Sequence, residues 1–200
     1  MEKSYDFRKK LLTVHEADLY DKSRKQKENE FFLKDGTTVK ISKTASEVIK
    51  TATKDFIDFL KVSMGIEAKL STDGENADIN ICLASDCDAD LEDVASYRGF
   101  KVETDENGIK VCGYDARGAS QGLYFLEDIM TFEKAPVIPF GVMKKKPMFS
   151  PQMVHSAYGL DCYPDEYLAR IAHEGRDTIL VFTKGVNETP DGYLDFNDLI

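Results

Sequence analysis

The sequence predicts an α+β fold, in which a mixed β-sheet carries two helices on one face and is followed by a βαβ unit. Two amphipathic segments, 45–64 and 116–130, show helical spacing of apolar residues and alternate with short strand-like runs. An Asn-Gly pair separates two of these runs, as in a β-hairpin. After residue 147 the pattern changes, and residues 178–182 form a continuous apolar run that is typical of a buried parallel strand.

The first of the two helical segments carries a single apolar stripe, and charged residues occupy its other side. The stripe consists of Ala45, Val48, Ile49, Ala52, Phe56, Phe59 and Leu60. Thr44, with Glu47 three residues later, matches a capping box, and Gly65 provides a C-terminal stop. Alternating runs at 37–41 and 78–83 predict strands on either side of this helix.

A hairpin and a second helix follow. Alternating runs on both sides of Asn107-Gly108 predict the hairpin. These runs are 97–103 and 109–113. Asp115 is placed to cap the second helix, and Gly118 and Gly122 lie on that helix four residues apart. Because glycine is unfavourable inside a helix, we expect these two positions to let the helix backbone lie close against the sheet.

The predicted domain boundary lies in a proline-containing stretch. Pro136 and Pro139, followed by Lys144-Lys145-Lys146-Pro147, interrupt the pattern. In so acidic a chain we interpret the three lysines as part of a solvated linker rather than as a nucleic-acid patch. Within the lead-in, residues 21–30 are almost entirely charged or polar, which predicts a solvated helix or a loose segment. The predicted segments are a lead-in at 1–30, an α+β accessory domain at 31–143 and the start of a second domain at 148–200.

The second domain begins as a βαβ unit. Residues 149–157 form a mostly apolar run, and Pro164-Asp165-Glu166 begins a helix that Gly175 ends. The run at 178–182 is the second strand, and a strand-helix-strand order predicts a right-handed parallel crossover.

Composition excludes several classes of partner. The formal net charge is −10, which argues against nucleic acid or an anionic membrane surface as the main partner. No stretch approaches the roughly 20 apolar residues that a membrane span requires. The first six residues do not begin a signal peptide, so a cytoplasmic location is the default expectation. A chain from which a leader had been removed would look the same.

The four cysteines are expected to be reduced thiols with no metal. Cys82, Cys87, Cys112 and Cys162 form no C-x-x-C pair, and no histidine stands near them at zinc-site spacing. Cys82 and Cys112 fall inside strand-like runs, where a thiol behaves as a small apolar residue. A metal or disulfide role is the less favoured alternative, and no cofactor is predicted.

The segment from Tyr97 to Met130 resembles a known family. It reads Tyr-Arg-Gly-Phe-Lys-Val, an Asn-Gly hairpin, Ile-Lys-Val-Cys-Gly, and then Asp-Ala-Arg-Gly-Ala-Ser-Gln-Gly-Leu-Tyr-Phe-Leu. This order resembles the non-catalytic domain that precedes the barrel in glycoside hydrolase family 20, whose best-known members are β-N-acetylhexosaminidases. Similar domains precede the barrels of α-glucuronidases and related glycosidases. The resemblance covers 31–149 and implies that 148–200 begins a (β/α)8 barrel.

The predicted barrel start departs from family 20. The first strand of that family usually carries an Arg-Gly whose arginine binds substrate, whereas 149–154 contains no arginine. Its second strand leads to histidine and aspartate residues, and 183–188 contains neither. The resemblance therefore implies a glycosidase without specifying N-acetylhexosaminides. The catalytic Asp-Glu pair of the family lies on a later barrel strand, which implies that no catalytic residue falls within these 200 residues.

Barrel enzymes build their active sites at the carboxyl ends of the strands. The predicted strand ends here are 155–158 and 183–188. The candidate sugar-contacting residues are His155, Tyr158, Asn187 and Glu188. The alternative is a polar loop plus one histidine hydrogen-bonded to backbone. Glu188 and Asp191 are the only carboxylates near this rim, and because both lie in one loop we do not predict a catalytic role for either.

Two hypotheses follow. In the first, the chain is the N-terminal part of a glycoside hydrolase, with a structural accessory domain, carbohydrate bound through the full-length protein and catalytic residues downstream. The 200-residue chain itself is then inactive. In the second, it is a non-catalytic carbohydrate-binding or protein-interaction module. The sequence makes no prediction about oligomeric state.

Overall fold

The computed structural model describes residues 12–72, 77–87, 89–155 and 164–180. The chain divides into two compact units. The larger unit is His15–Met148, and the smaller unit comprises Met1–Val14 and Phe149–Ile200. Residues 15–30 thus belong to the same compact unit as the first predicted domain.

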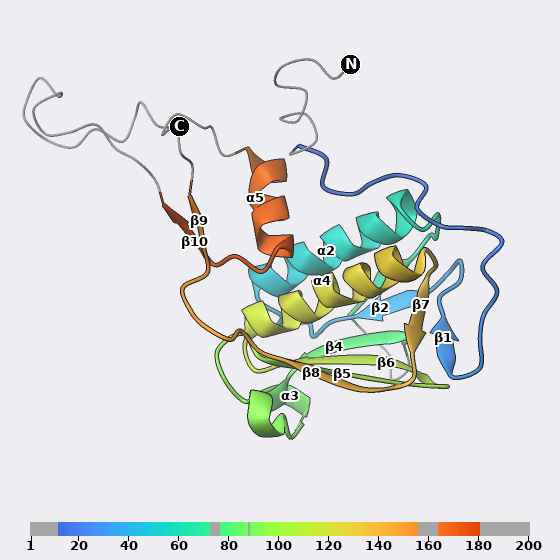
Figure 1. Cartoon of the computed structure of the whole chain (residues 1–200). Coiled ribbons are helices and arrows are strands. Elements are labelled where there is room, and N and C mark those ends of the chain that lie inside the picture. The colour runs from blue at the N-terminus through green and yellow to red at the C-terminus, as the bar shows by residue number, and fades with distance from the viewer. Residues whose placement is uncertain (1–11, 73–76, 88, 156–163, 181–200) are drawn as a thin grey trace, which may run out of the picture. The chain divides into compact units, whose positions relative to one another are not determined.

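A six-stranded mixed sheet forms one layer of the larger unit, in the order β3-β2-β4-β6-β5-β8 (Figure 1). Its strands are β2 (Thr38–Lys40), β3 (Lys69–Ser71), β4 (Ile79–Leu83), β5 (Phe100–Asp105), β6 (Gly108–Gly113) and β8 (Gly141–Lys145). β2 pairs in parallel with β3 and β4, and β4 with β6, whereas β5 pairs antiparallel with β6 and β8. The mixed sheet and the hairpin between β5 and β6 are therefore confirmed.

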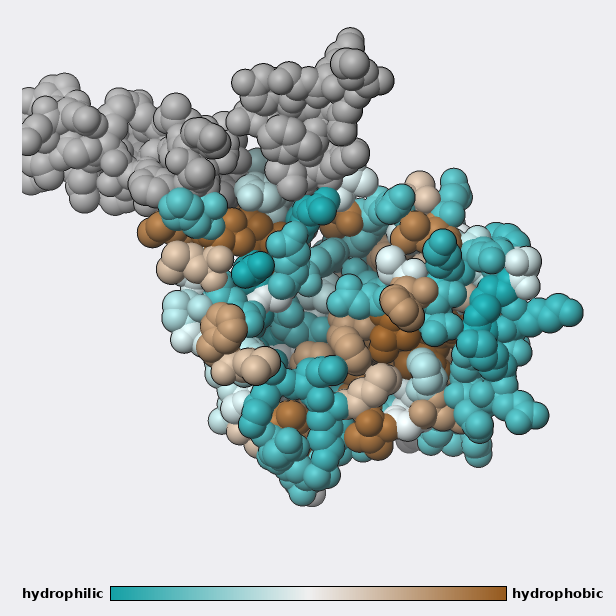
Figure 2. All heavy atoms as spheres, viewed as in Figure 1, coloured by the Kyte–Doolittle hydropathy of each residue, from teal (hydrophilic) through white to brown (hydrophobic). Residues whose placement is uncertain are grey.

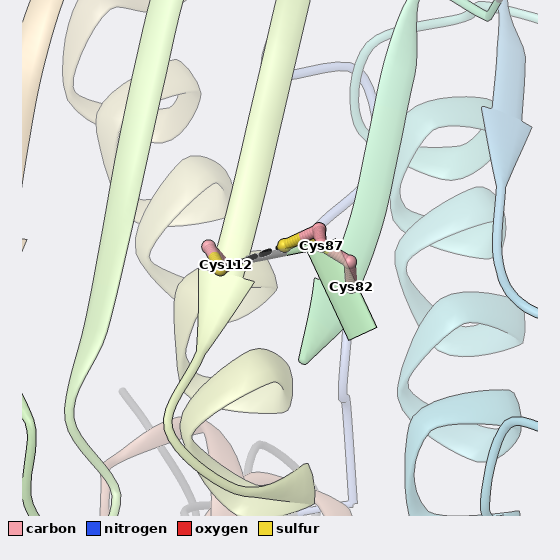
Figure 3. A group of neighbouring side chains, drawn as sticks. All are labelled: Cys82, Cys87 and Cys112. Carbon is pink, nitrogen blue, oxygen red and sulfur yellow. Dashed lines mark hydrogen bonds between the residues drawn. The ribbon is translucent and has the colours of Figure 1, made fainter. Parts of the chain in front are cut away.

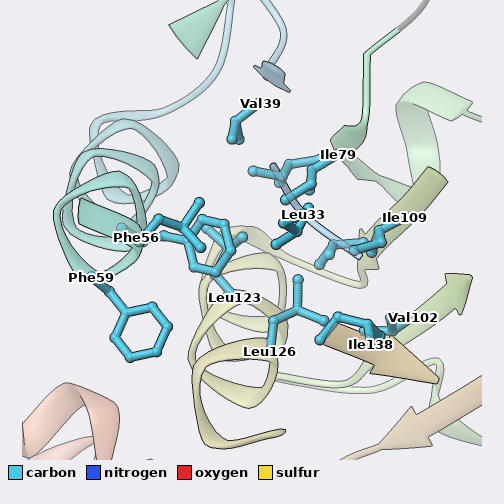
Figure 4. Close-up of a cluster of buried hydrophobic side chains, with 14 of the residues drawn as sticks. Leu33, Val39, Phe56, Phe59, Ile79, Val102, Ile109, Leu123, Leu126 and Ile138 are labelled. Carbon is cyan, nitrogen blue, oxygen red and sulfur yellow. The ribbon is translucent and has the colours of Figure 1, made fainter. Parts of the chain in front are cut away.

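The two long helices, α2 (Glu47–Val62) and α4 (Ala116–Glu133), both cover one face of this sheet (Figure 1). Alternate strand residues join Phe56, Leu123 and Leu126 of the helices in one buried cluster (Figure 4). The strand residues of this cluster are Val39, Ile79, Ile81, Phe100, Val102, Ile109 and Val111. Burying each large apolar side chain stabilises the fold by roughly 1.5–3 kcal/mol. The predicted α+β fold class, with both helices on one face, is confirmed.

One predicted cap is correct and one is wrong. The carboxylate of Asp115 accepts the Gly118 amide at 2.7 Å and so caps α4, as predicted. Helix α2 begins later than expected, because its N-cap is Ser46 and not Thr44. The hydroxyl of Thr44 instead contacts the hydroxyl of Ser42 at 2.9 Å. Ser and Thr side chains near a helix start can either cap the helix or hydrogen-bond to each other. The sequence alone therefore does not tell which of several neighbouring Ser and Thr residues is the N-cap.

The two helix glycines allow the close approach that the sequence predicts. A Cβ atom at Gly118 would lie 2.3 Å from the carbonyl oxygen of Gly99, just before β5. A Cβ atom at Gly122 would lie 2.4 Å from Cγ1 of Val111 in β6. Both distances are far below van der Waals contact, so no larger residue fits without movement of the helix or the hairpin.

The proline-containing stretch at 136–147, where the sequence pattern breaks, contributes two strands to the larger unit. It contains β7 (Val137–Pro139), which pairs antiparallel with β1 (Glu30–Phe32), and β8, which forms an edge of the large sheet. Sequence alternation does not identify β8, because Gly141 and Val142 are exposed and Met143 is only half-buried. Proline is tolerated at strand ends and sheet edges, so the prolines here mark edges instead of a linker.

The lysines of this stretch make specific contacts instead of forming a solvated linker. Lys144 forms an ion pair with Glu92, and Lys146 donates to the carbonyl oxygen of Asp93 at 2.6 Å. The Lys145 ammonium lies 5.5 Å from the ring centre of Phe125. These three lysine contacts join the 3-10 turn η1 (Glu92–Val94) and the side of α4 to the edge of the sheet.

The lead-in packs on the larger unit through charge pairs and contains no helix between residues 21 and 30. Arg24 contacts the carboxylate of Glu30 at 2.7 Å and that of Glu133 at 2.9 Å. The hydrogen bond from Arg24 holds the pKa of Glu30 below its ordinary value. The expectation of a solvated helix or loose segment is therefore wrong, because this segment is tied to the end of α4.

The smaller unit contains the predicted βαβ arrangement. Its elements are β9 (Met153–His155), α5 (Asp165–His173) and β10 (Thr178–Leu180). The two strands pair in parallel, with Leu180 beside His155. The expectation of a strand buried on both faces is wrong for the described part of β10, since Leu180 is 39% exposed and Thr178 and Ile179 are half-buried. Whether this unit begins a barrel stays a prediction.

The surface of the described residues is mostly hydrophilic in the view of Figure 2. None of the described helices combines the length and the hydrophobicity that a membrane span requires.

Gly122→Leu should destabilise the larger unit by about 1–3 kcal/mol, because the added side chain must displace Val111 or the helix itself. Thermal or urea unfolding followed by circular dichroism measures this. Arg117→Leu is the matched control, since Arg117 is exposed on the same helix. A Gly122→Leu protein that unfolds at the same midpoint as the parent would show that the close contact is not required.

Candidate functional site

Of the predicted sugar-binding residues, the structure describes His155, which lies at the carboxyl edge of the parallel pair β9 and β10. His155 is the last residue of β9, is exposed, and has Leu180 as its neighbour on β10. Parallel strands present their carboxyl ends at one edge, so the segments that follow both strands leave from the same edge. Tyr158, Asn187 and Glu188 lie outside the described residues, as does Asp191. Their roles stay predictions.

At the opposite edge, Asp177 fixes the register of the two strands. Its carboxylate accepts the Gln152 amide at 2.7 Å and the Ser150 hydroxyl at 3.1 Å. The Gln152 carbonyl oxygen in turn accepts the amides of Asp177 and Thr178 at 3.0 and 3.2 Å. A carboxylate that accepts this many hydrogen bonds next to two strand starts aligns them. Asp177 therefore positions His155 indirectly, through the strand pairing, and is itself far from the carboxyl edge.

The larger unit contains a hollow of about 480 Å³ beside β1. Three phenylalanines, Phe31, Phe32 and Phe140, line it together with the carboxylates of Glu30, Asp35, Asp78 and Glu106. Three of these carboxylates accept hydrogen bonds within the fold, Asp35 from the Glu67 amide at 3.0 Å. Asp78 accepts the backbone amide and the hydroxyl of Thr38 at 2.7 and 2.9 Å, and Glu30 is paired with Arg24. The aromatic faces are thus the part of this hollow best suited to contact a ligand.

A second hollow, of about 470 Å³, lies at the tip of the β5–β6 hairpin. Its polar lining includes Asn80, Glu103, Asp105, Asn107 and Lys110. Sequence reasoning identified neither hollow, because each gathers residues that are distant along the chain.

Glu127 is a buried carboxyl on α4 that the sequence did not single out. Burial raises its pKa well above the ordinary value for glutamate, and the nearby carboxylates of Asp55 and Asp128 raise it further. The carboxylate of Asp55 itself contacts Nε2 of His15 at 3.2 Å. Glu127 belongs to the helix layer of the larger unit, where burial raises the pKa of its carboxyl group.

Three cysteines also come together, contrary to what their spacing suggests. Cys82 on β4, Cys112 on β6 and Cys87 on the short helix α3 (Ala84–Cys87) have sulfur atoms that all lie within 4.8 Å of one another (Figure 3). The expectation that Cys82 and Cys112 lie in strands is confirmed. Burial raises the pKa of Cys112. All three are free thiols, and they are the part of the described chain best suited to hold a soft metal ion.

Comparison with known proteins shows a likeness in fold. No protein-family profile matches the sequence, and no curated protein sequence matches it. A family GH115 4-O-methyl-α-glucuronidase with specificity for decorated arabinogalactans superposes with a TM-score of 0.57 at 14% identity, over 75% of this chain and 25% of that enzyme. The N-acetyl-β-hexosaminidase of Streptomyces plicatus superposes with a TM-score of 0.60 at 15% identity, over 75% of this chain and 30% of that enzyme.

The GH20 β-N-acetylhexosaminidase of Streptomyces coelicolor A3(2) is a third example, with a TM-score of 0.51 at 15% identity over 63% of this chain and 25% of that enzyme. The chain therefore spans between 25% and 30% of the length of these three enzymes. Its fold resembles parts of glycoside hydrolases from two families, GH115 and GH20.

Glu127→Gln should stabilise the chain in alkaline solution and change little in acid. Folding raises the pKa of this carboxyl group. Its contribution to the free energy of unfolding is therefore fully present only below the unfolded pKa of about 4.3, and it is lost as the pH rises through the pKa of the folded chain. We expect a melting temperature higher by roughly 2–4 °C at about pH 8, and no change at about pH 4.

Asp128→Asn, at an exposed neighbour on the same helix, should shift melting less. Equal effects of Glu127→Gln at both pH values would contradict a raised pKa.

Proposed function

We propose that this chain is the N-terminal part of a glycoside hydrolase, with a structural accessory domain followed by the start of the catalytic barrel. The observation that carries the proposal is the order of the two units. A mixed sheet with both helices on one face is followed directly by a parallel βαβ unit. The likeness in fold to glycosidases extends over 75% of this chain in two cases and supports the same order.

The way in which the larger unit uses its polar groups supports the proposed accessory role. Asp115 caps a helix, Asp78 binds the backbone of β2, and Arg24 joins Glu30 to Glu133. Each of these contacts stabilises the fold and leaves no opposed pair of carboxyl groups facing an open site among them. Glycosidic cleavage requires such a pair, flanking the scissile bond. The larger unit therefore suits a structural task, which we propose is to cover part of the barrel.

The catalytic carboxylates are proposed to lie on barrel strands after residue 200. The described part of the smaller unit contains two strands, whereas a barrel gathers its active site from eight strand ends. Of its described carboxylates, Glu174 and Asp177 lie between the end of α5 and the start of β10, which is away from the carboxyl edge where barrel chemistry occurs. Asp165 and Glu166 begin α5 as neighbours in one helical turn, so they do not form a pair that flanks a substrate from two sides.

We further propose that the carboxyl edge of β9 and β10 supplies part of the sugar-binding surface. His155 lies at that edge, and Tyr158, Asn187 and Glu188 follow the same two strands in the sequence. Imidazole, phenol, amide and carboxylate groups can all hydrogen-bond sugar hydroxyls, and a tyrosine ring can also stack on a sugar face.

A second candidate function is carbohydrate binding without catalysis. The hollow lined by Phe31, Phe32 and Phe140 favours it, because aromatic faces next to hydrogen-bonding groups suit a sugar ring. Isothermal titration of the chain with oligosaccharides tests it. Binding that Phe140→Ala abolishes, in a protein that remains folded, would favour this function over the enzymatic one.

The 200-residue chain should hydrolyse no aryl glycoside, whereas the longer product of the same reading frame should hydrolyse at least one. A chromogenic panel of N-acetylhexosaminides, glucuronides, glucosides and galactosides, run on both proteins side by side, measures this. In the longer protein, His155→Ala should raise KM more than it changes kcat, since the imidazole is proposed to bind the sugar. Turnover by the short chain that Glu188→Gln abolishes would overturn the proposal that the chemistry lies downstream.

A further inference from the structure

The sheet face opposite α2 and α4 carries the three thiols described above, which the proposed function does not use. Cys82 and Cys112 are direct neighbours in the parallel pairing of β4 and β6. Cys87 reaches them from α3, which immediately follows β4 (Figure 3). Three elements thus bring three sulfur atoms to one place, and two of these elements belong to the centre of the sheet.

The two sulfur–sulfur distances at Cys112 are close to those around a single bound ion. The sulfur of Cys112 lies 3.7 Å from that of Cys82 and 3.3 Å from that of Cys87. Thiolates bind zinc at about 2.3 Å, so two thiolates at a tetrahedral angle on one ion are about 3.8 Å apart. Small side-chain rotations would bring the sulfurs around a common centre while the two strands stay in place.

Apolar side chains cover one side of the cysteine cluster. Leu91 and Val94 are buried against Cys112, and Ala84 and Ala89 pack beside them. This apolar wall limits water access from one side, which strengthens metal–thiolate bonds. Cys82 and Cys87 are half-buried, so the other side stays accessible to an entering ion and to a fourth ligand such as water.

The charges near Cys112 are mixed. Burial, Glu103 and Asp86 raise the pKa of its thiol, whereas Lys110 and Lys101 lower it, so a bound cation must supply the remaining stabilisation of the thiolates. The sulfur of Cys87 now donates to the carbonyl oxygen of Leu83 at 3.1 Å, a contact that holds its side chain toward the other two.

We propose that Cys82, Cys87 and Cys112 form a binding site for a thiophilic metal ion, for which Zn²⁺ is the probe. Each thiol gives up its proton to the buffer on binding, and the three thiolates with one Zn²⁺ form a complex of net charge −1. Thiolate ligands favour Zn²⁺ and Cu⁺ over the oxygen-seeking ions Mg²⁺ and Ca²⁺. This site is independent of the glycosidase proposal, since it lies wholly within the larger unit.

The test is a titration of the reduced 200-residue chain, freed of reductant under anaerobic conditions, with Zn²⁺ in competition with a chromophoric chelator. We expect one equivalent to bind. Co²⁺ should give the near-ultraviolet sulfur-to-metal band and the visible bands of a tetrahedral thiolate site. Cys87→Ser and Cys112→Ser should each weaken binding by about tenfold or more. Cys162→Ser, at the fourth cysteine of the sequence, should leave affinity unchanged.

Circular dichroism of each variant establishes that it is folded, and Cys87→Ser keeps the test valid if the more buried Cys112 cannot be replaced. Absence of binding by the folded, reduced parent would overturn the assignment, as would binding that neither variant weakens. Oxidation by glutathione disulfide gives a further check. If it forms a disulfide between two of the three cysteines equally fast with and without Zn²⁺, the assignment is also overturned. That last result would assign the cluster to thiol–disulfide exchange.

Discussion

The close contact between α4 and the β5–β6 hairpin holds the larger unit together. Gly118 and Gly122 bring the helix backbone within reach of Gly99 and Val111, and no larger residue can take their places without movement. Asp115 reinforces this contact, because its carboxylate caps α4 and also accepts the Arg98 amide at 3.0 Å, just before β5. Since α4 also packs against α2, β4 and β7, a shift of this helix would disturb both layers of the fold.

The same contact explains how the two faces of the sheet come to differ. One face is covered by two long helices and is apolar, while among the described residues α3 and the turn after it lie on the other (Figure 1). One face of the hairpin therefore packs against the helices, and the other face carries polar and thiol groups. In β6 the alternation is direct, with Ile109 and Val111 facing the helices and Cys112 facing the opposite way.

Sequence reasoning predicted the elements whose signals are local. The apolar stripe of α2, the Asp115 cap and the hairpin around Asn107 all depend on neighbouring residues. The cap and the hairpin are confirmed, and so is the stripe from Ile49 to Leu60, whereas Val48 is exposed and Ala45 precedes the helix. It missed β8, whose edge position leaves Val142 exposed and removes the alternation that reveals a strand. It also missed the pairing of Arg24 with Glu133, because partners 109 residues apart leave no local pattern.

The candidate sites also differ in whether a local sequence signal predicts them. The position of His155 at a strand end follows from a local apolar run and is confirmed. The other predicted sugar-contacting residues, Tyr158, Asn187 and Glu188, fall outside the described residues. The convergence of Cys82 with Cys112 depends on strand order, since 30 residues and a hairpin separate them. Spacing alone could not reveal it, because parallel register is set by the whole sheet.

Native-state hydrogen exchange tests the central claim most directly, because it measures which amides are released only by global unfolding. If the contact of α4 with the hairpin holds the larger unit together, amides of α4, β5 and β6 should be the slowest to exchange. They should also share one free energy of opening and one dependence on denaturant. The account would be contradicted if α4 amides exchanged through a separate opening of lower free energy while β5 and β6 stayed protected.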